Sequence, residues 1–297
     1  SHATGRDGRV SDQQTGVLLV LDATRRLKSA GVPDAARDAR RLFSHAMGVA
    51  TSRLTLTLLE PVAAPDAARF ETLIARRLNR EPVSHIIGTR AFYGRDFAVS
   101  SDVLDPRPET EMLIEVALRS HFTRMVDLGT GSGCILVTLL AEVPKCRGIG
   151  IDLSPAALSV AQRNAATHGV TTRAQFHVGD WLSAVAGPFD LIVANPPYIA
   201  ADEMAGLSPE VVQWEPAMAL TDYADGLTHY RRIVSQTVPL LLPGGRLIFE
   251  IGPTQGAAVA QMMRDAGLRH VTIVSDLDGR DRVVSAQMVG FSPEKCG

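Results

Sequence analysis

From Arg124 onward, short apolar runs alternate with longer stretches of helical periodicity, and this alternation restricts the fold more than any other feature of the chain. Short apolar runs bounded by turn residues are typical of buried strands, whereas apolar residues three and four positions apart indicate helices. Strands that alternate with helices build an open α/β sheet with a mostly parallel core. The seven strand candidates read RMVDLG, RGIGID, AQFHVGD, DLIVAN, GRLIFEIG, HVTIVSD and RVVSAQMV.

The chain before this region has a different pattern. From about Thr15 to Leu78 the apolar residues recur at helical spacing in three segments, which predicts a small helical bundle. Residues 88–104 alternate apolar and polar around Gly94, which predicts a β-hairpin. We therefore expect a helical domain over 1–82, a linker with the hairpin over 83–105, and the α/β domain over 106–297. The many Arg residues of the bundle indicate a solvated helix face or a docking surface.

Composition narrows the classes of function. The chain has 297 residues, 45% of them apolar, which is enough to fill the cores of two domains. Its 30 basic and 32 acidic residues leave a formal charge of −2, so the total charge gives no sign of attraction to nucleic acid. Three cysteines without a CxxC pair argue against a disulfide framework or a zinc site. We expect no metal and reduced thiols at Cys134, Cys146 and Cys296.

The chain has no apolar stretch of membrane-spanning length, and its first residues lack the apolar core of a signal peptide. We expect a cytoplasmic protein without a membrane partner, and a monomer. Ser1 and His2 look like a cleavage scar from recombinant expression, and the first dozen residues are expected to be flexible.

A glycine-rich turn follows the first strand of the predicted sheet. In VDLGTGSGC, Gly129, Gly131 and Gly133 lie between Asp127 and the next helix. Glycines at such a turn let the backbone bend tightly and let a ligand approach closely, although an ordinary flexible loop has the same composition. The GxGxG spacing lacks the last glycine of the dinucleotide fingerprint and the Lys of a P-loop. A pyrophosphate ligand is therefore not indicated, and a nicotinamide dehydrogenase is disfavoured.

Two acids end the next strands. Asp152 ends the second strand, where a carboxylate accepts hydrogen bonds from a ribose diol; capping of the following helix is the alternative, although Ser154 suits that role better. Asp180 and Trp181 end the third strand. Asp180 suits an adenine amino group, and Trp181 suits the face of a flat base. The alternative is that this segment is only a turn. This combination fits an adenosine that carries something other than phosphate, and S-adenosylmethionine fits best.

The fourth strand ends in IVANPPYI, residues 192–199. Proline has no N–H and fixes its own φ, so Pro196 and Pro197 stop the strand directly after Asn195. The Asn195 side chain and nearby carbonyls then offer spare acceptors at the edge of the sheet, which suits gripping an NH₂ group. A rigid turn without a chemical role is the competing interpretation.

Several of these segments together resemble one family. DLGTGSG, NPPYI and VLDPRPETE, with EPVSHIIGTRAFYGRDF and GRDRVV, are similar to the release-factor glutamine methyltransferases of the HemK or PrmC type, from about Thr15 to Val289. NPPY alone is shared with adenine-N6 DNA methyltransferases; the PRPETE segment and the hairpin narrow the resemblance. Asp105 departs from the family, which usually has an aliphatic residue there, and leaves the packing at the hairpin exit open.

The resemblance implies a class I methyltransferase sheet. It also implies methyl transfer from S-adenosylmethionine to the side-chain amide nitrogen, N5, of the glutamine in the Gly-Gly-Gln motif of peptide-chain release factors, with S-adenosylhomocysteine as product. The helical domain fits docking of such a large protein substrate. The implied cofactor residues, with Asp180 added from the strand-end argument, are Gly129, Thr130, Gly131, Ser132, Gly133, Asp152, Asp180, Trp181 and Asn195. The implied substrate residues are Asn195, Pro196, Pro197 and Tyr198.

An amide nitrogen is a poor nucleophile because its lone pair is delocalised into the carbonyl. We expect catalysis by Asn195, Pro196 and Tyr198: the Asn195 side-chain oxygen and the Pro196 carbonyl accept the two amide N–H groups, and Tyr198 packs on the amide plane. No base is needed before attack, because the proton becomes acidic once the nitrogen is alkylated.

Two alternatives remain. A DNA adenine methyltransferase would flip a base into the same clamp, but it needs a DNA-reading region and a basic groove, and the sequence indicates neither. A non-catalytic binding protein would retain only a vestigial pocket, against which the intact cofactor residues argue.

Overall fold

The computed structural model describes residues 14–289, and the chain divides into two compact units between Ile87 and Gly88. The predicted flexibility of the first dozen residues and the Cys296 thiol lie outside the described residues. The helix α5 (Val83–Ile87), which the sequence-based boundaries assign to the linker, falls in the first unit, because Val83 and Ile86 are buried in the core of that unit.

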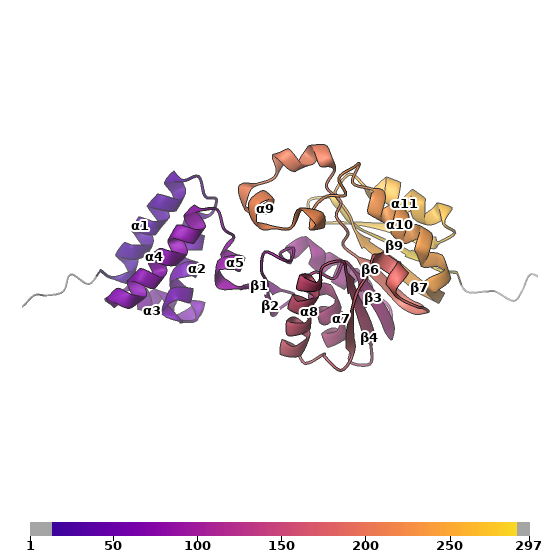
Figure 1. Ribbon diagram of the computed structural model, residues 1–297, viewed down its shortest axis with the longest axis horizontal. Coiled ribbons are helices and arrows are strands. Elements are labelled where there is room, and N and C mark those ends of the chain that lie inside the picture. The colour runs from indigo at the N-terminus through magenta and orange to yellow at the C-terminus, as the bar shows by residue number, and fades with distance from the viewer. Residues whose placement is uncertain (1–13, 290–297) are drawn as a thin grey trace, which may run out of the picture. The chain divides into compact units, whose positions relative to one another are not determined.

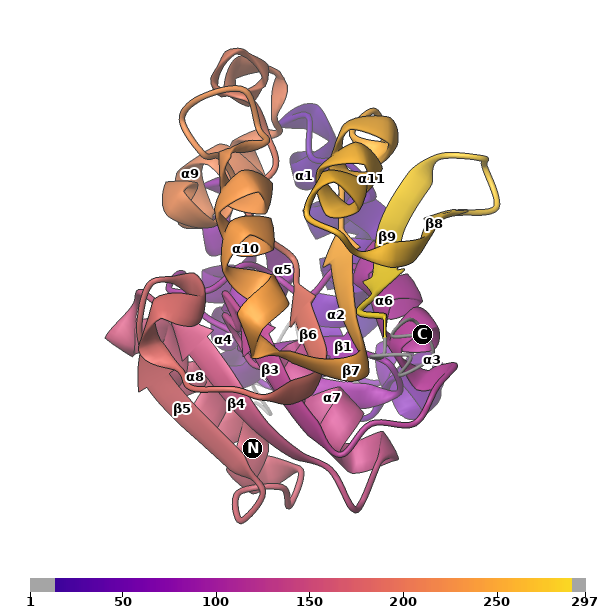
Figure 2. The ribbon, with the colours of Figure 1, turned by 90° about the vertical axis from the view of Figure 1, so that its right-hand side faces the viewer.

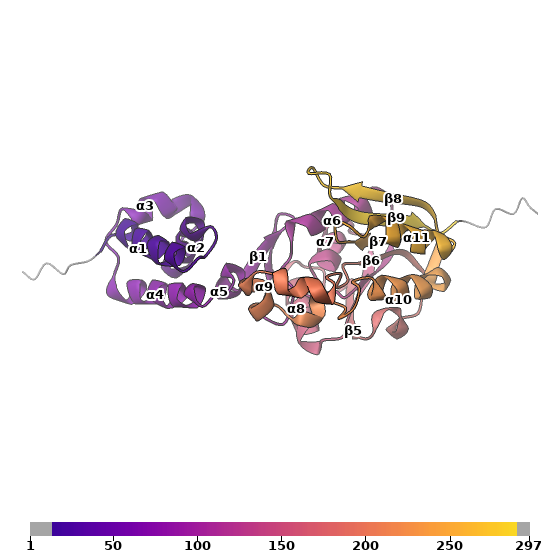
Figure 3. The same cartoon turned by 90° about the horizontal axis from the view of Figure 1, so that it is seen from above.

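The first unit is the predicted helical bundle (Figure 3). Its core contains the edge-to-face pair of Phe43 and Phe70, whose ring centroids lie 5.3 Å apart. The sequence predicts its three long helices, but the two short ones, α3 and α5, have too few turns to show a period. The helices are α1 (Gly16–Ser29), α2 (Ala35–Met47), α3 (Leu54–Leu58), α4 (Ala64–Leu78) and α5.

The second unit begins with the predicted hairpin. Strands β1 (Thr89–Phe92) and β2 (Arg95–Ala98) pair antiparallel across a two-residue turn, in which Tyr93 and Gly94 both have positive φ. Such turns match the twist of the two strands. The short helix η2 (Pro108–Thr110) then leads into α6 (Glu111–Leu118).

The second unit contains the predicted seven-stranded sheet, in the order β5-β4-β3-β6-β7-β9-β8 (Figure 2). Neighbouring strands from β5 to β7 are parallel, and β9 runs antiparallel to both β7 and β8. The α/β fold class is thereby confirmed. The strands are β3 (Arg124–Leu128), β4 (Arg147–Asp152), β5 (Ala174–Val178), β6 (Phe189–Ala194), β7 (Leu241–Glu250), β8 (Arg269–Ser275) and β9 (Asp281–Gln287).

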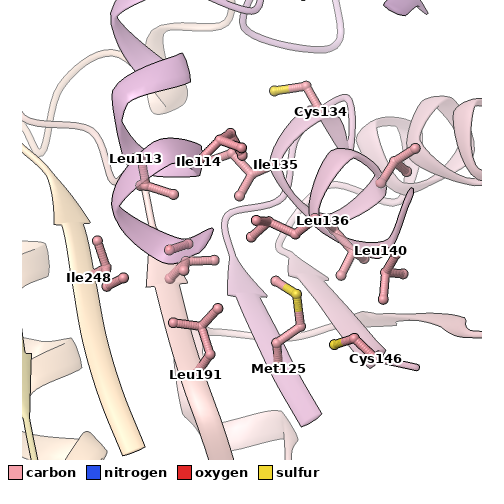
Figure 4. Close-up of a cluster of buried hydrophobic side chains, with 14 of the residues drawn as sticks. Leu113, Ile114, Met125, Cys134, Ile135, Leu136, Leu140, Cys146, Leu191 and Ile248 are labelled. Carbon is pink, nitrogen blue, oxygen red and sulfur yellow. The ribbon is translucent and has the colours of Figure 1, made fainter. Parts of the chain in front are cut away.

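Helices cover both faces of this sheet. Side chains of a strand alternate between faces, so Leu191 of β6 packs against α6 and α7 (Cys134–Glu142), as Figure 4 shows, whereas Ile192 packs against α10 (Thr228–Thr237) and α11 (Gly256–Asp265). The helix α8 (Pro155–Thr167) lies with α6 and α7. Burial on both faces explains the nearly continuous apolar strands.

From β3 to β5 the chain adds each new strand toward one edge of the sheet, and from β6 onward it adds strands on the opposite side of β3. The switch point therefore lies between β3 and β6. These neighbours are parallel, and Leu128 of β3 pairs with Ala194 of β6 at their carboxyl ends. Ligands of open α/β sheets bind at such a switch point. Beyond β6 the chain forms η4 (Ala201–Gly206), α9 (Pro209–Trp214) and η5 (Ala217–Ala219) before α10; this segment arches away from the sheet (Figures 1 and 2). We call it the roof.

No helix within residues 14–289 has both the length and the apolar character that crossing a membrane requires. Cys134 and Cys146 are free and buried. Over the same residues, no group of three or more His, Cys, Asp or Glu side chains is arranged to hold a metal ion.

Candidate active site

The glycine turn after β3 needs its glycines. Gly129, Gly131 and Gly133 have φ of +70°, +53° and +79°, a backbone region that other L-residues adopt rarely. A β carbon at Gly129 would lie 3.3 Å from Cζ3 of Trp181, and one at Gly133 would lie 3.0 Å from the β carbon of Ala161. The turn is therefore both left-handed and closely packed, and a bulkier residue would fill space beside Trp181.

Asp127 stabilises the glycine turn from the interior of the protein. Its side chain is fully buried, and Oδ2 accepts a hydrogen bond of 2.7 Å from the Thr130 hydroxyl. Burial raises the pKa of Asp127 to about 7, and the hydrogen bond from Thr130 opposes that rise. Thr130 and Ser132 are themselves buried, so these two predicted cofactor residues shape the turn from inside.

Asp152 joins the turn to the end of β4. Its Oδ2 accepts the backbone N–H of Gly131 at 2.9 Å, and its Oδ1 accepts that of Ser154, also at 2.9 Å. Each carboxylate oxygen has further acceptor capacity, which a ribose hydroxyl can use. Ser154, and not Asp152, caps α8, because its Oγ accepts the N–H of Ala157. The alternative role of Asp152 as that cap is therefore not observed.

Trp181 lines the cavity, whereas its neighbour Asp180 does not. Trp181 is buried, lines the cavity described below, and lies against the His229 ring with centroids 5.0 Å apart. Its buried Nε1–H has no hydrogen-bond partner among the described residues, so an acceptor is needed there. Asp180 instead pairs with Arg232 of α10 at 2.6 Å and does not line the cavity. Its contact with adenine stays a prediction.

His229 is half-buried at the start of α10. Burial lowers the pKa of His229, with a further lowering by Arg232 and an opposing effect of Asp222 and Asp180. A neutral imidazole therefore lines the cavity beside Trp181 at neutral pH.

The NPPY segment lies where β6 ends. Asn195 and Pro197 line the cavity, Pro196 is buried, and Tyr198 is half-buried behind them. Within residues 14–289 the Asn195 side chain forms no hydrogen bond, so its amide is available to a ligand. Burial raises the pKa of Tyr198 to about 12, and the charge of Glu250 adds to this effect. Tyr198 is therefore a neutral phenol.

Charged side chains from three segments that are distant in the sequence influence the pKa of Tyr198. Arg107 and Glu109 come from the PRPETE segment, Arg282 comes from the GRDR segment, and each acts on the pKa of Tyr198. Glu250, at the end of β7, is fully buried, and its burial raises its pKa to about 7. Two of the segments that carry the family resemblance, PRPETE and GRDR, thus place charges that act on Tyr198 of the NPPY turn.

Asp105, the departure from the family pattern, is buried where the hairpin exit lies against the roof. Its backbone N–H donates to Glu215 of the roof at 3.3 Å, and Arg107 forms an ion pair with the same carboxylate. Burial raises the pKa of Glu215, whereas Arg107 lowers it. The hairpin exit and the roof are therefore joined through Glu215, and the contact of Asp105 uses only its backbone N–H, which an aliphatic residue also offers.

These elements enclose a cavity of about 250 Å³ at the carboxyl ends of β3, β4 and β6. Of the predicted residues, it is lined by Gly129, Gly131, Asp152, Trp181, Asn195 and Pro197; Thr130, Ser132, Gly133, Asp180, Pro196 and Tyr198 do not line it. The sequence interpretation missed the hairpin exit, Ser101–Leu104, and three roof residues, Pro216, Met218 and Ala219, as well as His229. Val103 and Leu104 belong to the VLDPRPETE segment, to which the resemblance assigns no site role; the other residues lie in no recognisable motif, so only the fold identifies them.

The fold and the site together define a Rossmann-like methyltransferase. Residues 19–88 match the model of the PrmC N-terminal domain, and residues 97–213 match that of the methyltransferase small domain. A release factor glutamine methyltransferase of Cereibacter sphaeroides is 56% identical over 266 residues, which cover 90% of this chain and 96% of the relative. A release factor glutamine methyltransferase of Rhodospirillum rubrum is 46% identical, and the match covers 97% of this chain and 91% of the relative. The chain belongs to the release factor glutamine methyltransferase family.

Solved structures agree with the fold assignment. A methyltransferase from Pyrococcus furiosus covers 73% of this chain and 98% of its own, with a TM-score of 0.52 and 16% sequence identity. At this level of identity the likeness shows the fold alone.

Proposed function

We propose that this enzyme transfers a methyl group from S-adenosylmethionine to the side-chain amide nitrogen of the glutamine in the Gly-Gly-Gln motif of peptide-chain release factors. The observation that carries the proposal is the cavity, where the glycine turn, Asp152 and the unpartnered amide of Asn195 lie together. The substrate is supported by the relatives, which are release factor glutamine methyltransferases. No specific observation on residues 14–289 favours the DNA adenine alternative.

The residues present fit the cofactor. Gly129 leaves the space beside Trp181 open, and the two oxygens of Asp152 retain acceptor capacity for a ribose diol. The indole of Trp181 offers an apolar face and a buried donor to a base. S-adenosylmethionine supplies an electrophilic methyl group on a sulfonium. Asp180 is a candidate for the adenine amino group if it exchanges its partner Arg232 for the base.

Positioning of the substrate amide falls to the NPPY turn. The Asn195 side-chain oxygen and the Pro196 carbonyl accept its two N–H groups and hold the nitrogen in the direction of attack. Tyr198 packs on the amide plane, and Pro197 closes the turn. After transfer, alkylation makes the remaining proton acidic, and it passes along these hydrogen bonds to solvent water.

The helical unit is proposed to dock the release factor. Four leucines of this unit have more than half of their surface exposed to solvent: Leu18, Leu21, Leu56 and Leu59. The first pair lies on α1 and the second on α3 and its end, and the Gly16 N–H donates to the Glu60 carbonyl where these helices approach each other. Exposed leucines are candidate anchors for a protein partner. A cytoplasmic location follows from this substrate, because release factors act on the translating ribosome.

The test is a transfer assay with methyl-labelled S-adenosylmethionine, a purified release factor, and duplex DNA as a competing acceptor. Mass spectrometry is expected to locate one methyl group on the glutamine of the Gly-Gly-Gln motif. A release factor with glutamate at that position is the matched control and should stay unlabelled. Label on adenine, or no label on the release factor, contradicts the proposal.

A further inference from the structure

Gln255 lies in the loop between β7 and α11 and ties three loops together. Its Nε2 donates to the carbonyl of Tyr198 at 2.9 Å and to that of Gly226 at 3.1 Å, while its Oε1 accepts the N–H of Gly252 at 2.9 Å. The side chain is half-buried and does not line the cavity. Both N–H groups and the oxygen of the Gln255 side-chain amide are therefore hydrogen-bonded to backbone groups.

The Tyr198 carbonyl is confined from a second side as well. Gly226 approaches it so closely that a β carbon at position 226 would lie 2.4 Å from the Tyr198 oxygen. Gly226 also has a φ of +79°, which disfavours any other residue. The carbonyl is thus held between a donor and a close backbone contact.

This restraint reaches the acceptors of the site through a stiff backbone. Pro196 and Pro197 each have a fixed φ, so the chain between Asn195 and Tyr198 has few free dihedral angles. Holding the Tyr198 carbonyl therefore limits the direction of the Pro196 carbonyl and of the Asn195 side chain.

We propose that Gln255 is a positioning residue for methyl transfer: it fixes the far end of the NPPY turn so that the acceptors at the near end face the substrate nitrogen. This inference rests on the proposed function. Only an amide combines two donors with an acceptor at this length, because a glutamate would set a carboxylate against two carbonyl oxygens, and a methionine would leave all three backbone groups unpaired.

The test compares Gln255→Glu and Gln255→Met with a matched control, Gln261→Glu. Gln261 lies on α11, where it is exposed and bonds only to Asp265 among the described residues. We expect both Gln255 variants to lose on the order of 10-fold to 10²-fold in kcat, the range that a misplacement of about 1 Å produces. The affinity for S-adenosylmethionine, measured by calorimetry, should stay within about twofold of wild type. The control should match wild type in both.

Two results overturn the inference. One is wild-type kcat in both Gln255 variants; the other is a parallel loss of kcat, cofactor affinity and melting temperature, which would make Gln255 a purely structural residue. The Asn195→Ala variant, assayed alongside, separates this inference from the proposed function. If Asn195→Ala is inactive and the Gln255 variants are not, only the inference fails; if Asn195→Ala is fully active, the proposed clamp itself fails.

Discussion

The carboxylate of Asp152 and the backbone N–H of Gly131 are joined by a hydrogen bond of 2.9 Å, which links the end of β4 to the glycine turn after β3. Asp152 therefore shapes the turn and faces the cavity at once. We expect Asp152→Ala to weaken binding of S-adenosylmethionine about 10-fold or more, since a hydrogen bond to a charged group contributes roughly 1.5–3 kcal/mol. Isothermal titration calorimetry measures this affinity, and an unchanged value removes Asp152 from the cofactor site.

Asp180→Asn is the companion variant. If Asp180 accepts the adenine amino group, the loss of its charge should weaken cofactor binding several-fold, because charged acceptors form the stronger hydrogen bonds. Arg232→Gln breaks the same ion pair and leaves Asp180 in place, so it separates the two roles. Equal affinity in Asp180→Asn and wild type assigns Asp180 to the ion pair alone.

Asn195→Ala should keep the fold and lose on the order of 10²-fold or more in kcat, the range for removing one group that stabilises a transition state. The fold should survive because the Asn195 side chain forms no hydrogen bond within residues 14–289. Single-turnover assays with a release factor measure the loss, and circular dichroism checks the fold. Turnover equal to wild type contradicts a catalytic role for Asn195.

Glu250→Gln should change how stability depends on pH. Burial raises the pKa of Glu250 from 4.5 to about 7. Between these values the unfolded carboxyl ionises while the folded one stays protonated, so the free energy of unfolding of the wild type falls as pH rises, by about 3 kcal/mol for this group. The variant lacks this fall, and its advantage should therefore grow from pH 4.5 to 7.

Tryptophan fluorescence during denaturant unfolding measures this effect selectively. The chain has 2 tryptophans, Trp181 and Trp214, and both lie in the second unit with Glu250. Glu60→Gln, at an exposed position of the helical unit, is the control and should keep the wild-type slope. Parallel pH profiles for Glu250→Gln and wild type would show that the buried carboxyl does not titrate in this range.

The pair Leu21→Glu and Leu59→Glu tests docking by the helical unit. We expect the double variant to raise KM for the release factor about 10-fold or more, since a buried apolar anchor at an interface contributes upward of roughly 1 kcal/mol. Cofactor affinity and kcat should not change. Leu277→Glu, on an exposed leucine of the second unit, is the matched control. An unaltered KM in the double variant places docking elsewhere.

The central strands of the sheet were predictable because they are buried on both faces. The sequence run RGIGID coincides with β4 (Arg147–Asp152), since two covered faces demand an unbroken apolar run with turn residues at its ends. Helices as short as α3 and α5 carry no such signal, because five residues complete less than two turns. Their placement follows from burial in the bundle core, which is a tertiary property.

The site was predictable only where a residue ends a strand. Asp152 and Asn195 were found because the carboxyl ends of parallel strands gather at one edge. Arg232, which pairs with Asp180, lies 52 residues further along the chain, and nothing local indicates that contact. His229 and the roof residues reach the cavity through a long irregular segment, whose path depends on contacts such as that between Arg107 and Glu215.

Leu128 and Ala194 are paired residues on adjacent strands, and the glycine turn and Asn195 follow them directly. The points at which the glycine turn and the NPPY turn leave the sheet are therefore set by the spacing of hydrogen-bonded strands, about 4.8 Å. Roof and helical unit can diverge in evolution, or be exchanged by engineering, without altering that spacing.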